Sequence, residues 1–450
     1  MVWGKGWRDL RMGRSLPKDL VVLEFGHKFN HALGGVTFPA GLRCIKLGKG
    51  FNQPTEGVAW PPALKELYFG NNFNRSLNET DWPPRLEVLE FTGRFNQPID
   101  GIVWPTALKR LVFGHKFNQP IQGAAWPKHL EHLAMGLRFD QDIDGTEFPE
   151  NLRYLDFGGS FDQRLDSAVF PEGLAVIHLG WRHDRALGSV KWPDGLKELS
   201  LGTEFDHPLQ GVMWPPQLEW LCLGDAFNCS LTGVFFPTTL LHLRLGFAFR
   251  QPLVGVQWPD ALEELILYEE FTAPTRTEAW PRGLKRLSVG ANFPLGDAET
   301  GFPAGLEILD WGMCEGLLAS TPVELKPISW PPSLRRLEIG PWFNVSIDGF
   351  VWPATLTELT FGSSFNRPIE GVTWPPGLER LDLGVDIEQP IDNVDWPLSL
   401  KVLAMGSKCF HRDGRKVKGP SWLKELKVAT NNDVGARRLE RFGWAVQQQQ

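Results

Sequence analysis

The chain has 450 residues, of which 42% are hydrophobic and 22% charged, and its formal net charge is −7. This composition is that of a folded protein, and the acidic balance argues against a nucleic-acid partner. No stretch approaches the roughly 20 apolar residues of a transmembrane helix, and the first residues lack the apolar core of a signal peptide. The five cysteines contain no Cys-x-x-Cys motif. We therefore expect a cytoplasmic protein with reduced thiols and no membrane partner.

In chain order, residues 1–15 precede the first repeat and are expected to form an N-terminal cap. Trp3, Trp7, Leu10 and Met12 supply the apolar surface that could cover the first coil. Without such a cap, the first strand would leave an open sheet edge.

From residue 16 onward the chain is built from a 22-residue unit. An aromatic–Pro pair recurs every 22 residues from Phe38-Pro39 to Phe302-Pro303. One step of 28 residues follows, and the pair resumes from Trp330-Pro331 to Trp396-Pro397. With degenerate units at both ends, residues 16–428 make about 19 units. A fixed period of this size indicates a solenoid, in which each coil is stable only when it packs on its neighbours.

The pattern within a unit predicts one short strand per coil. Unit positions are counted from the aromatic residue as position one. Positions eight to ten alternate apolar and variable residues, as in Leu111-Val112-Phe113, and this alternation is typical of a strand. Pro and Gly in the rest of the unit stand where they would break a helix, which favours extended segments and turns there. The prediction is a mainly β, parallel β-solenoid with little helix, whose buried set in one unit is Trp104, Leu108, Leu111, Phe113 and Phe117.

Position six of the unit alternates in charge along the chain. Lys65, Glu87, Lys109 and Glu131 are an example from four consecutive units. Parallel coils in register place these side chains next to one another, where unlike charges attract. We expect a structural charge ladder in which each exposed pair contributes roughly 0.2–1 kcal/mol.

Positions seven and nine should face outward from the sheet, and in the middle units they become aromatic and rich in histidine. Aromatic residues and Arg are enriched at binding hot spots. This composition favours a protein or peptide site there, while neutral drift on a sheet surface is the alternative. The predicted partner-binding residues are His132, Tyr154, Asp156, His178, Trp220, His242 and Arg244.

No catalytic, cofactor-binding or metal-binding residue is expected. His132, His178 and His242 lie two and three coils apart, roughly 10–15 Å by strand spacing, which is too far for one zinc ion. The sequence has no phosphate-binding Gly-rich loop and no nucleophile elbow. The alternative function is an enzyme that acts on polysaccharides and needs paired carboxylates. Asp156 with Asp184 is the nearest approach to such a pair. An ice-binding solenoid would need a regular Thr ladder, which the outward positions lack.

Two irregular stretches follow towards the end of the chain. Residues 313–329 form an insertion in the unit that begins at Phe302, with a bulged loop and a functional loop as the two interpretations. Residues 411–418 are the densest basic run and are expected to be a solvated loop. Residues 429–450 are expected to hold a capping helix, which Asp433 could begin as N-cap, and a frayed tail.

The repeat resembles a leucine-rich repeat in its Leu-x-x-Leu-x-Phe/Leu pattern. It is more specifically similar to the FNIP-repeat family, because Asn96-Gln97-Pro98-Ile99 and Asn118-Gln119-Pro120-Ile121 match the core of that repeat. The resemblance covers about residues 16–428. The chain departs from the family in using Trp-Pro where Leu-Pro is common. Its Asn also lies two residues later than the ladder Asn of ordinary leucine-rich repeats, so the same Asn ladder is not assumed.

The resemblance also bears on function. FNIP repeats occur together with F-box, kinase or GTPase modules, which implies that the repeats recognise substrates or partners. We therefore expect a monomeric, non-enzymatic protein–protein interaction scaffold. It would bind a protein or peptide on the exposed face of its repeat sheet.

Overall fold

The computed structural model describes residues 2–3, 16–272, 276, 279–293, 301–312, 328–391, 393–410 and 420–429. In this part of the chain the fold is a parallel β-solenoid that is almost free of helix; η2 (Ser407–Phe410) is a single 3-10 turn. The chain divides into two compact units. Unit 1 comprises Met1–Cys229 and Val234–Leu240, and unit 2 comprises Ser230–Gly233 and Leu241–Gln450.

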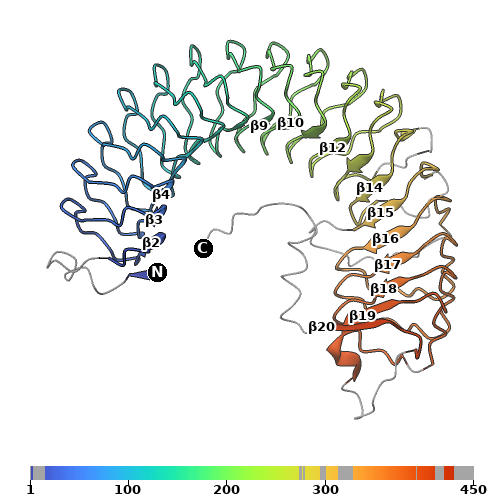
Figure 1. The fold of residues 1–450 in the computed structure, drawn as a ribbon. Helices are drawn as coiled ribbons and strands as arrows, with labels where there is room; N and C mark the ends of the chain where they lie inside the picture. The colour runs from blue at the N-terminus through green and yellow to red at the C-terminus, as the bar shows by residue number, and fades with distance from the viewer. Residues whose placement is uncertain are drawn as a thin grey trace. The chain divides into compact units, whose positions relative to one another are not determined.

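The strands of unit 1 follow one another in chain order along one side of the coils (Figure 1). Neighbouring strands are parallel and pair with an offset of 22 residues, so that Leu111 lies beside Leu89 and Leu133. The strands are β1 (Val2–Trp3), β2 (Val22–Phe25), β3 (Cys44–Lys46), β4 (Glu66–Phe69), β5 (Val88–Phe91), β6 (Arg110–Val112), β7 (His132–Ala134), β8 (Tyr154–Asp156), β9 (Val176–His178), β10 (Glu198–Ser200) and β11 (Trp220–Cys222).

Unit 2 repeats the same arrangement. Its strands are also parallel, and the 28-residue step between β15 and β16 keeps the register, because Leu309 lies beside Leu337. The strands are β12 (His242–Arg244), β13 (Glu264–Ile266), β14 (Arg286–Val289), β15 (Ile308–Trp311), β16 (Arg336–Ile339), β17 (Glu358–Thr360), β18 (Arg380–Asp382), β19 (Val402–Gly406) and β20 (Glu425–Ala429).

The core of each coil is the predicted apolar set. Leu108, Leu111 and Phe117 are 0% exposed, Phe113 is 3% and Trp104 is 5% exposed. Equivalent rings stack from coil to coil, and Phe117 lies 6.2 Å from both Phe95 and Phe139, measured between ring centroids. Stacked rings add roughly 0.5–1.5 kcal/mol per pair to the free energy gained from burial. The coils are therefore held together mainly by columns of like side chains.

A glycine after the strand allows the coils to approach closely. A Cβ atom at Gly136 would lie 2.1 Å from the carbonyl oxygen of Gly114 in the preceding coil. This glycine begins a turn that the N–H of Phe139 closes by donating to the carbonyl of Gly136, at 2.9 Å. The repeated glycine is thus needed for backbone stacking at this corner, because a side chain would push the coils apart.

The charge ladder predicted at position six is confirmed by ion pairs within each unit. In unit 1, Lys65 contacts Glu87 at 2.6 Å and Lys197 contacts Glu219 at 2.9 Å. In unit 2, Lys285 contacts Glu263 at 2.5 Å and Lys401 contacts Glu379 at 2.6 Å. These side chains are about half exposed, so water and salt screen each pair and its contribution to stability is small.

The asparagines at position 15 form a ladder, which the sequence argument did not assume. The side-chain oxygen of Asn96 accepts the backbone N–H of Asn118 at 2.8 Å, and Asn118 in turn accepts that of Asp140 at 2.9 Å. The following residue adds a second donor, because Gln119 Nε2 lies 3.1 Å from the Asn96 oxygen. We call the side chains at position 15 the rungs. Their ladder lies at another phase than in ordinary leucine-rich repeats, but satisfies backbone donors in the same manner.

Several predicted elements fall partly or wholly outside the described residues. Of the predicted N-terminal cap, only β1 is described, and it pairs with β2 as an additional parallel strand. The insertion at 313–329, apart from its last two residues, the basic run at 411–418 and the helix beginning at Asp433 lie outside the described residues. No helix in the described part of the chain is long and apolar enough to cross a bilayer.

Candidate functional site

The strand face of unit 1 carries the residues at positions seven and nine. In β7, β8 and β9 the middle residue is buried, whereas the residues on either side are partly exposed. The predicted outward direction of positions seven and nine is therefore confirmed for these strands. Because the sheet is parallel and in register, equivalent residues of successive coils lie side by side on this face.

Three rings and a carboxylate form a connected cluster over β7 to β10. His132 stacks flat on Tyr154, with ring centroids 4.1 Å apart and an interplanar angle of 7°. The Tyr154 hydroxyl lies 3.1 Å from Nδ1 of His178. Nε2 of His178 lies 3.2 Å from a carboxylate oxygen of Glu198. We call His132, Tyr154, His178 and Glu198 the ring cluster.

The hydrogen bonds of the ring cluster assign its protons. As a carboxylate Glu198 can only accept, so the Nε2–H of His178 donates a hydrogen bond to it. In the neutral imidazole Nδ1 is then the acceptor, and the Tyr154 hydroxyl donates to it. Burial raises the pKa of Tyr154, with the carboxylates of Asp156 and Glu198 adding to the effect, so the phenol keeps its proton. Each polar atom in this chain of contacts therefore has a defined role.

His132, at the other end of the cluster, is held in its neutral form. Burial lowers its pKa to about 3, and the positive charge of Arg110 and the His178 ring add to this effect. Arg110 itself is paired with Glu90 at 2.6 Å on the neighbouring strand. The stack of His132 on Tyr154 thus presents an uncharged aromatic surface at neutral pH. Such a surface is suited to apolar or aromatic contact with a partner.

Asp156 lies next to the cluster but does not form a catalytic pair. It is in register with His178, and its Oδ1 accepts the backbone N–H of Gly158 at 2.8 Å. Burial raises the pKa of Asp156, while that hydrogen bond acts in the opposite direction. Asp184, its suggested partner in a polysaccharide-acting enzyme, is a rung that accepts the N–H of Asp206 at 3.2 Å. The two carboxylates therefore belong to separate networks.

The remaining predicted residues divide between the two units. Trp220 lies on β11, in register with Glu198, and extends the ring cluster by one strand. His242 and Arg244 belong to unit 2, where His242 lies 2.9 Å from Glu264 and Arg244 lies over the ring of Tyr268, 5.0 Å from its centroid. Unit 1 thus brings together His132, Tyr154, Asp156 and His178, with Trp220 beyond Glu198.

Sequence reasoning missed Glu198, which completes the hydrogen-bonded chain. Glu198 occupies position seven, one coil after His178 at position nine, a separation of 20 residues. Tyr154 and His178 are joined by the opposite diagonal, a separation of 24 residues. Contacts at a period of 22 plus or minus two are the signal that would have found these partners.

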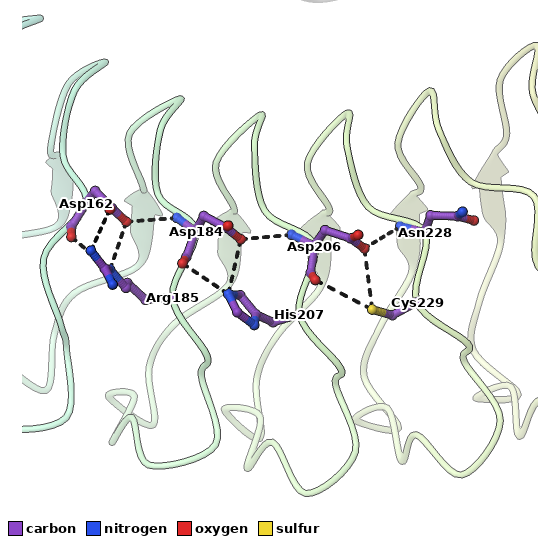
Figure 2. A network of polar contacts seen from close by, with 7 residues as sticks. All are labelled: Asp162, Asp184, Arg185, Asp206, His207, Asn228 and Cys229. Atoms are coloured by element: carbon purple, nitrogen blue, oxygen red, sulfur yellow. Dashed lines mark hydrogen bonds and ion pairs between the residues drawn. The ribbon is translucent and has the colours of Figure 1, made fainter.

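The rungs of the same coils are aspartates instead of asparagines (Figure 2). Asp162, Asp184 and Asp206 accept the backbone N–H of the following rung at 3.1, 3.2 and 2.8 Å. The side chain that comes directly after the following rung also contacts the carboxylate. Figure 2 shows this for Arg185, His207 and Cys229. Arg185 forms an ion pair with Asp162 at 2.7 Å, and His207 lies 3.2 Å from Asp184.

The last of these partners is a thiol without the features of a nucleophile. Sγ of Cys229 lies 3.4 Å from Oδ1 of Asp206. Burial, followed by this hydrogen bond and the negative charge of Asp206, raises the pKa of Cys229 to about 11. The thiol therefore stays protonated at neutral pH and serves as a weak donor to the rung.

The strand face of unit 2 carries mainly compensated charges. Arg286 contacts Asp310 at 2.8 Å, and Ser288 donates to the same carboxylate at 2.9 Å. Over β16 to β20 there is a shallow hollow of about 530 Å³ whose lining includes Arg336, Glu358 and Lys427. In the described part of the chain no group of three or more His, Cys, Asp or Glu side chains is placed to hold a metal ion.

Comparison with known proteins agrees with this geometry. The fold is that of the leucine-rich-repeat class of solenoids. The FNIP Repeat family matches residues 29–72, 51–94, 95–138 and 139–181. Residues 29–181 thus match the FNIP repeat, as the repeat signature indicated, and the fold is that of a leucine-rich-repeat-like solenoid. No curated protein matches the sequence.

Among solved structures, CroV588, described as a novel circular LRR protein, is 28% identical with a TM-score of 0.66. The match covers 92% of this chain and 73% of CroV588. A Toll–Spatzle complex from Drosophila matches at 15% identity and a TM-score of 0.46, over 92% of this chain and 66% of that one. An internalin from Listeria monocytogenes matches at 11% identity and a TM-score of 0.34, over 81% and 87%.

Proposed function

We propose that the chain is a non-enzymatic scaffold that binds a protein partner on the strand face of unit 1, over β7 to β11. The observation that carries this proposal is the ring cluster, with Trp220 one strand beyond it. Side chains in the cluster are ordered by a ring stack of 4.1 Å and hydrogen bonds of 3.1 and 3.2 Å. Ordering before binding reduces the entropy cost of association, which favours a recognition surface.

The chemistry of the cluster supports a protein partner over a small metabolite. The face is an open sheet surface of aromatic and imidazole rings with polar edges. Tyr and Trp combine a large apolar area with one polar atom, and these residue types dominate protein-binding hot spots. We propose that Tyr154 and Trp220 are the main anchors, that His132 supports Tyr154 by stacking, and that Glu198 orients His178.

The proposal is tested by recovering partners from the native cell through proximity labelling and pull-down. The wild-type chain is compared with a Tyr154→Ala/Trp220→Ala variant. Tyr68→Ala/Val88→Ala is the matched control, because both residues lie on the same face of unit 1, on β4 and β5. We expect the first variant to lose a protein partner that the control retains. Equal recovery by all three chains would place the binding surface elsewhere and end this proposal.

Compartment and assembly are part of the same proposal. We propose that the chain acts in the cytoplasm and as a monomer. Fractionation of the native cell and light scattering of the purified chain test these two points. Recovery in the secreted fraction, or a stable dimer at micromolar concentration, would contradict them.

A further inference from the structure

A second surface of unit 1 is formed by the turn that follows each strand. In the coils before residue 204, the two corner residues of this turn are often basic and never acidic. The cationic corner residues are Lys28, Lys49, Arg94, Lys116, Arg138 and Arg182. We call these six residues the basic row. All six are exposed.

The backbone fixes the turns of successive coils against one another. The N–H of Arg94 donates to the carbonyl of Asn71 in the preceding coil at 2.7 Å, and Lys116 donates to Gly93 at 3.0 Å. The same bond joins Arg138 to His115 at 3.1 Å. Corner residues therefore stand in one line along the unit, even though they are far apart in sequence. The row therefore does not appear as a run of basic residues in the sequence.

The cations of the row differ in their pairing from the cations on the strand segments. Within the part of the chain that the structure describes, none of the six forms an ion pair, in contrast to Lys65 and Arg110 on the neighbouring strand segments. Coils are about 4.8 Å apart, so neighbouring cations stand about one or two coils from each other. This separation is near the Debye length of about 8 Å at physiological ionic strength, so their potentials add.

Charge is segregated within several coils of unit 1. The turn that ends the coil carries carboxylates, at Glu56, Glu79, Asp100 and Asp144, all exposed. The rungs beside the first part of the row, Asn30 to Asn118, are neutral. A negative ligand is thus attracted to the basic row and repelled from the opposite turn, although the net charge of the chain is −7.

We propose that the basic row is a docking surface for an acidic, extended polypeptide segment of a partner protein. The row spans seven coil steps, on the order of 34 Å, which matches about ten residues of extended chain. Trp181, 62% exposed and packed over Gly159, lies beside Arg182 and provides an apolar anchor at that end. Single-stranded nucleic acid usually needs several aromatic platforms, whereas the row has one tryptophan. The acidic rungs beside Arg138 and Arg182 also disfavour a continuous phosphate backbone.

This surface is separate from the ring cluster, and its test can be read independently. Fluorescence anisotropy of the full chain is measured with a labelled peptide of alternating Glu and Ser, long enough to span the row. A peptide of alternating Gln and Ser, a single-stranded oligonucleotide and phosphatidylserine vesicles are measured in parallel. The variant Lys49→Glu/Arg94→Glu/Lys116→Glu reverses the part of the row beside neutral rungs.

The matched control is Lys18→Glu/Lys128→Glu/Lys191→Glu, which makes the same change in net charge at exposed positions outside the row. We expect the Glu-rich peptide to bind the wild type and the control with the same affinity. Its affinity for the row variant should be lower by a factor of roughly ten or more. Added salt should weaken binding to the wild type. A Lys49→Gln/Arg94→Gln/Lys116→Gln variant with an intermediate loss would support the assignment even if charge reversal disturbs folding.

Three outcomes would overturn the proposal. The first is equal loss of peptide binding in the row variant and its control, which would indicate a general charge effect. The second is binding of the oligonucleotide or the vesicles at the row without binding of the Glu-rich peptide. The third is absence of any binding that distinguishes the Glu-rich from the Gln-rich peptide.

Discussion

Two regions of unit 1 share one backbone and differ in their side chains. In residues 16–125 the rungs are asparagines, and the position-14 aromatic column is unbroken Phe up to Phe117. In residues 126–213 the rungs are aspartates, from Asp140 to Asp206. Each of these four coils also contributes one member of the ring cluster. The aspartate rungs and the ring cluster therefore occur in the same four coils. The repeat determines the architecture, and the departures from the repeat are concentrated in this one group of coils.

The exchange of asparagine for aspartate at the rung keeps the hydrogen-bond acceptor but adds a negative charge. An asparagine rung accepts through its oxygen without adding charge, as Asn96 does for Asn118. An aspartate rung accepts equally well, but its charge needs a cation or a donor nearby. Arg185 and His207 fill this role beside Asp162 and Asp184. The second region is therefore polar along its ladder as well as on its strand face.

The largest expected effect comes from breaking the aromatic column in the first region. Phe117 is 0% exposed and stacks between Phe95 and Phe139. Phe117→Ala leaves a cavity that the rigid coils on either side cannot close, and should lower the free energy of unfolding by about 3–5 kcal/mol. Urea unfolding followed by tryptophan fluorescence measures this value. A loss below about 1 kcal/mol would mean that the column does not hold the coils together.

In the second region, by contrast, a substitution in the same column should raise the stability of the protein. The position is His183. This residue replaces Phe in the column, is 0% exposed, and its two ring nitrogens have no hydrogen-bond partner in the described part of the chain. His183→Phe keeps a ring that can stack on Phe161 and removes an unsatisfied polar group. The variant should be more stable at neutral pH by about 1–3 kcal/mol. Unchanged or lower stability would show that the pocket is shaped for imidazole.

The stability difference between the wild type and His183→Phe should also depend on pH. Burial lowers the pKa of His183 to about 4, below the ordinary value of about 6.5 that applies in the unfolded chain. Between these values the unfolded state binds the proton first. The wild type should therefore lose stability as pH falls from 6.5 to 4, by up to about 3 kcal/mol, relative to His183→Phe. Above pH 6.5 the difference should be constant. Parallel curves throughout would contradict the assignment.

The smallest effect comes from exchanging one rung for the other type, and it is best seen beside removal of the rung. Asn118→Ala removes the acceptor for the N–H of Asp140 and for Gln141, and should cost about 1–3 kcal/mol. Asn118→Asp keeps the acceptor but places a charge next to Asp140, so the cost should be under about 1 kcal/mol and should shrink in high salt. Urea unfolding at two salt concentrations separates the two variants. Equal costs would contradict the rung account.

Much of the fold followed from the period of 22, because a repeat fixes which residues become neighbours. The buried set around Phe113 and the charge ladder around Lys65 depend only on that register. The rung ladder was missed because its phase differs from that of ordinary leucine-rich repeats. The role of Glu198 was missed because it depends on diagonal contacts between long side chains. His242 and Arg244 were grouped with Tyr154 by sequence spacing, although they belong to a different compact unit.

The most direct test of the functional region is hydroxyl-radical footprinting of the full chain, alone and with a partner recovered by proximity labelling. Oxidation is read by mass spectrometry at Tyr154, His178 and Trp220, with Tyr68 on β4 as the internal reference. We expect the partner to protect the first three side chains and to leave Tyr68 as reactive as before. Protection of Tyr68 without Tyr154 and Trp220, or protection confined to unit 2, would contradict it.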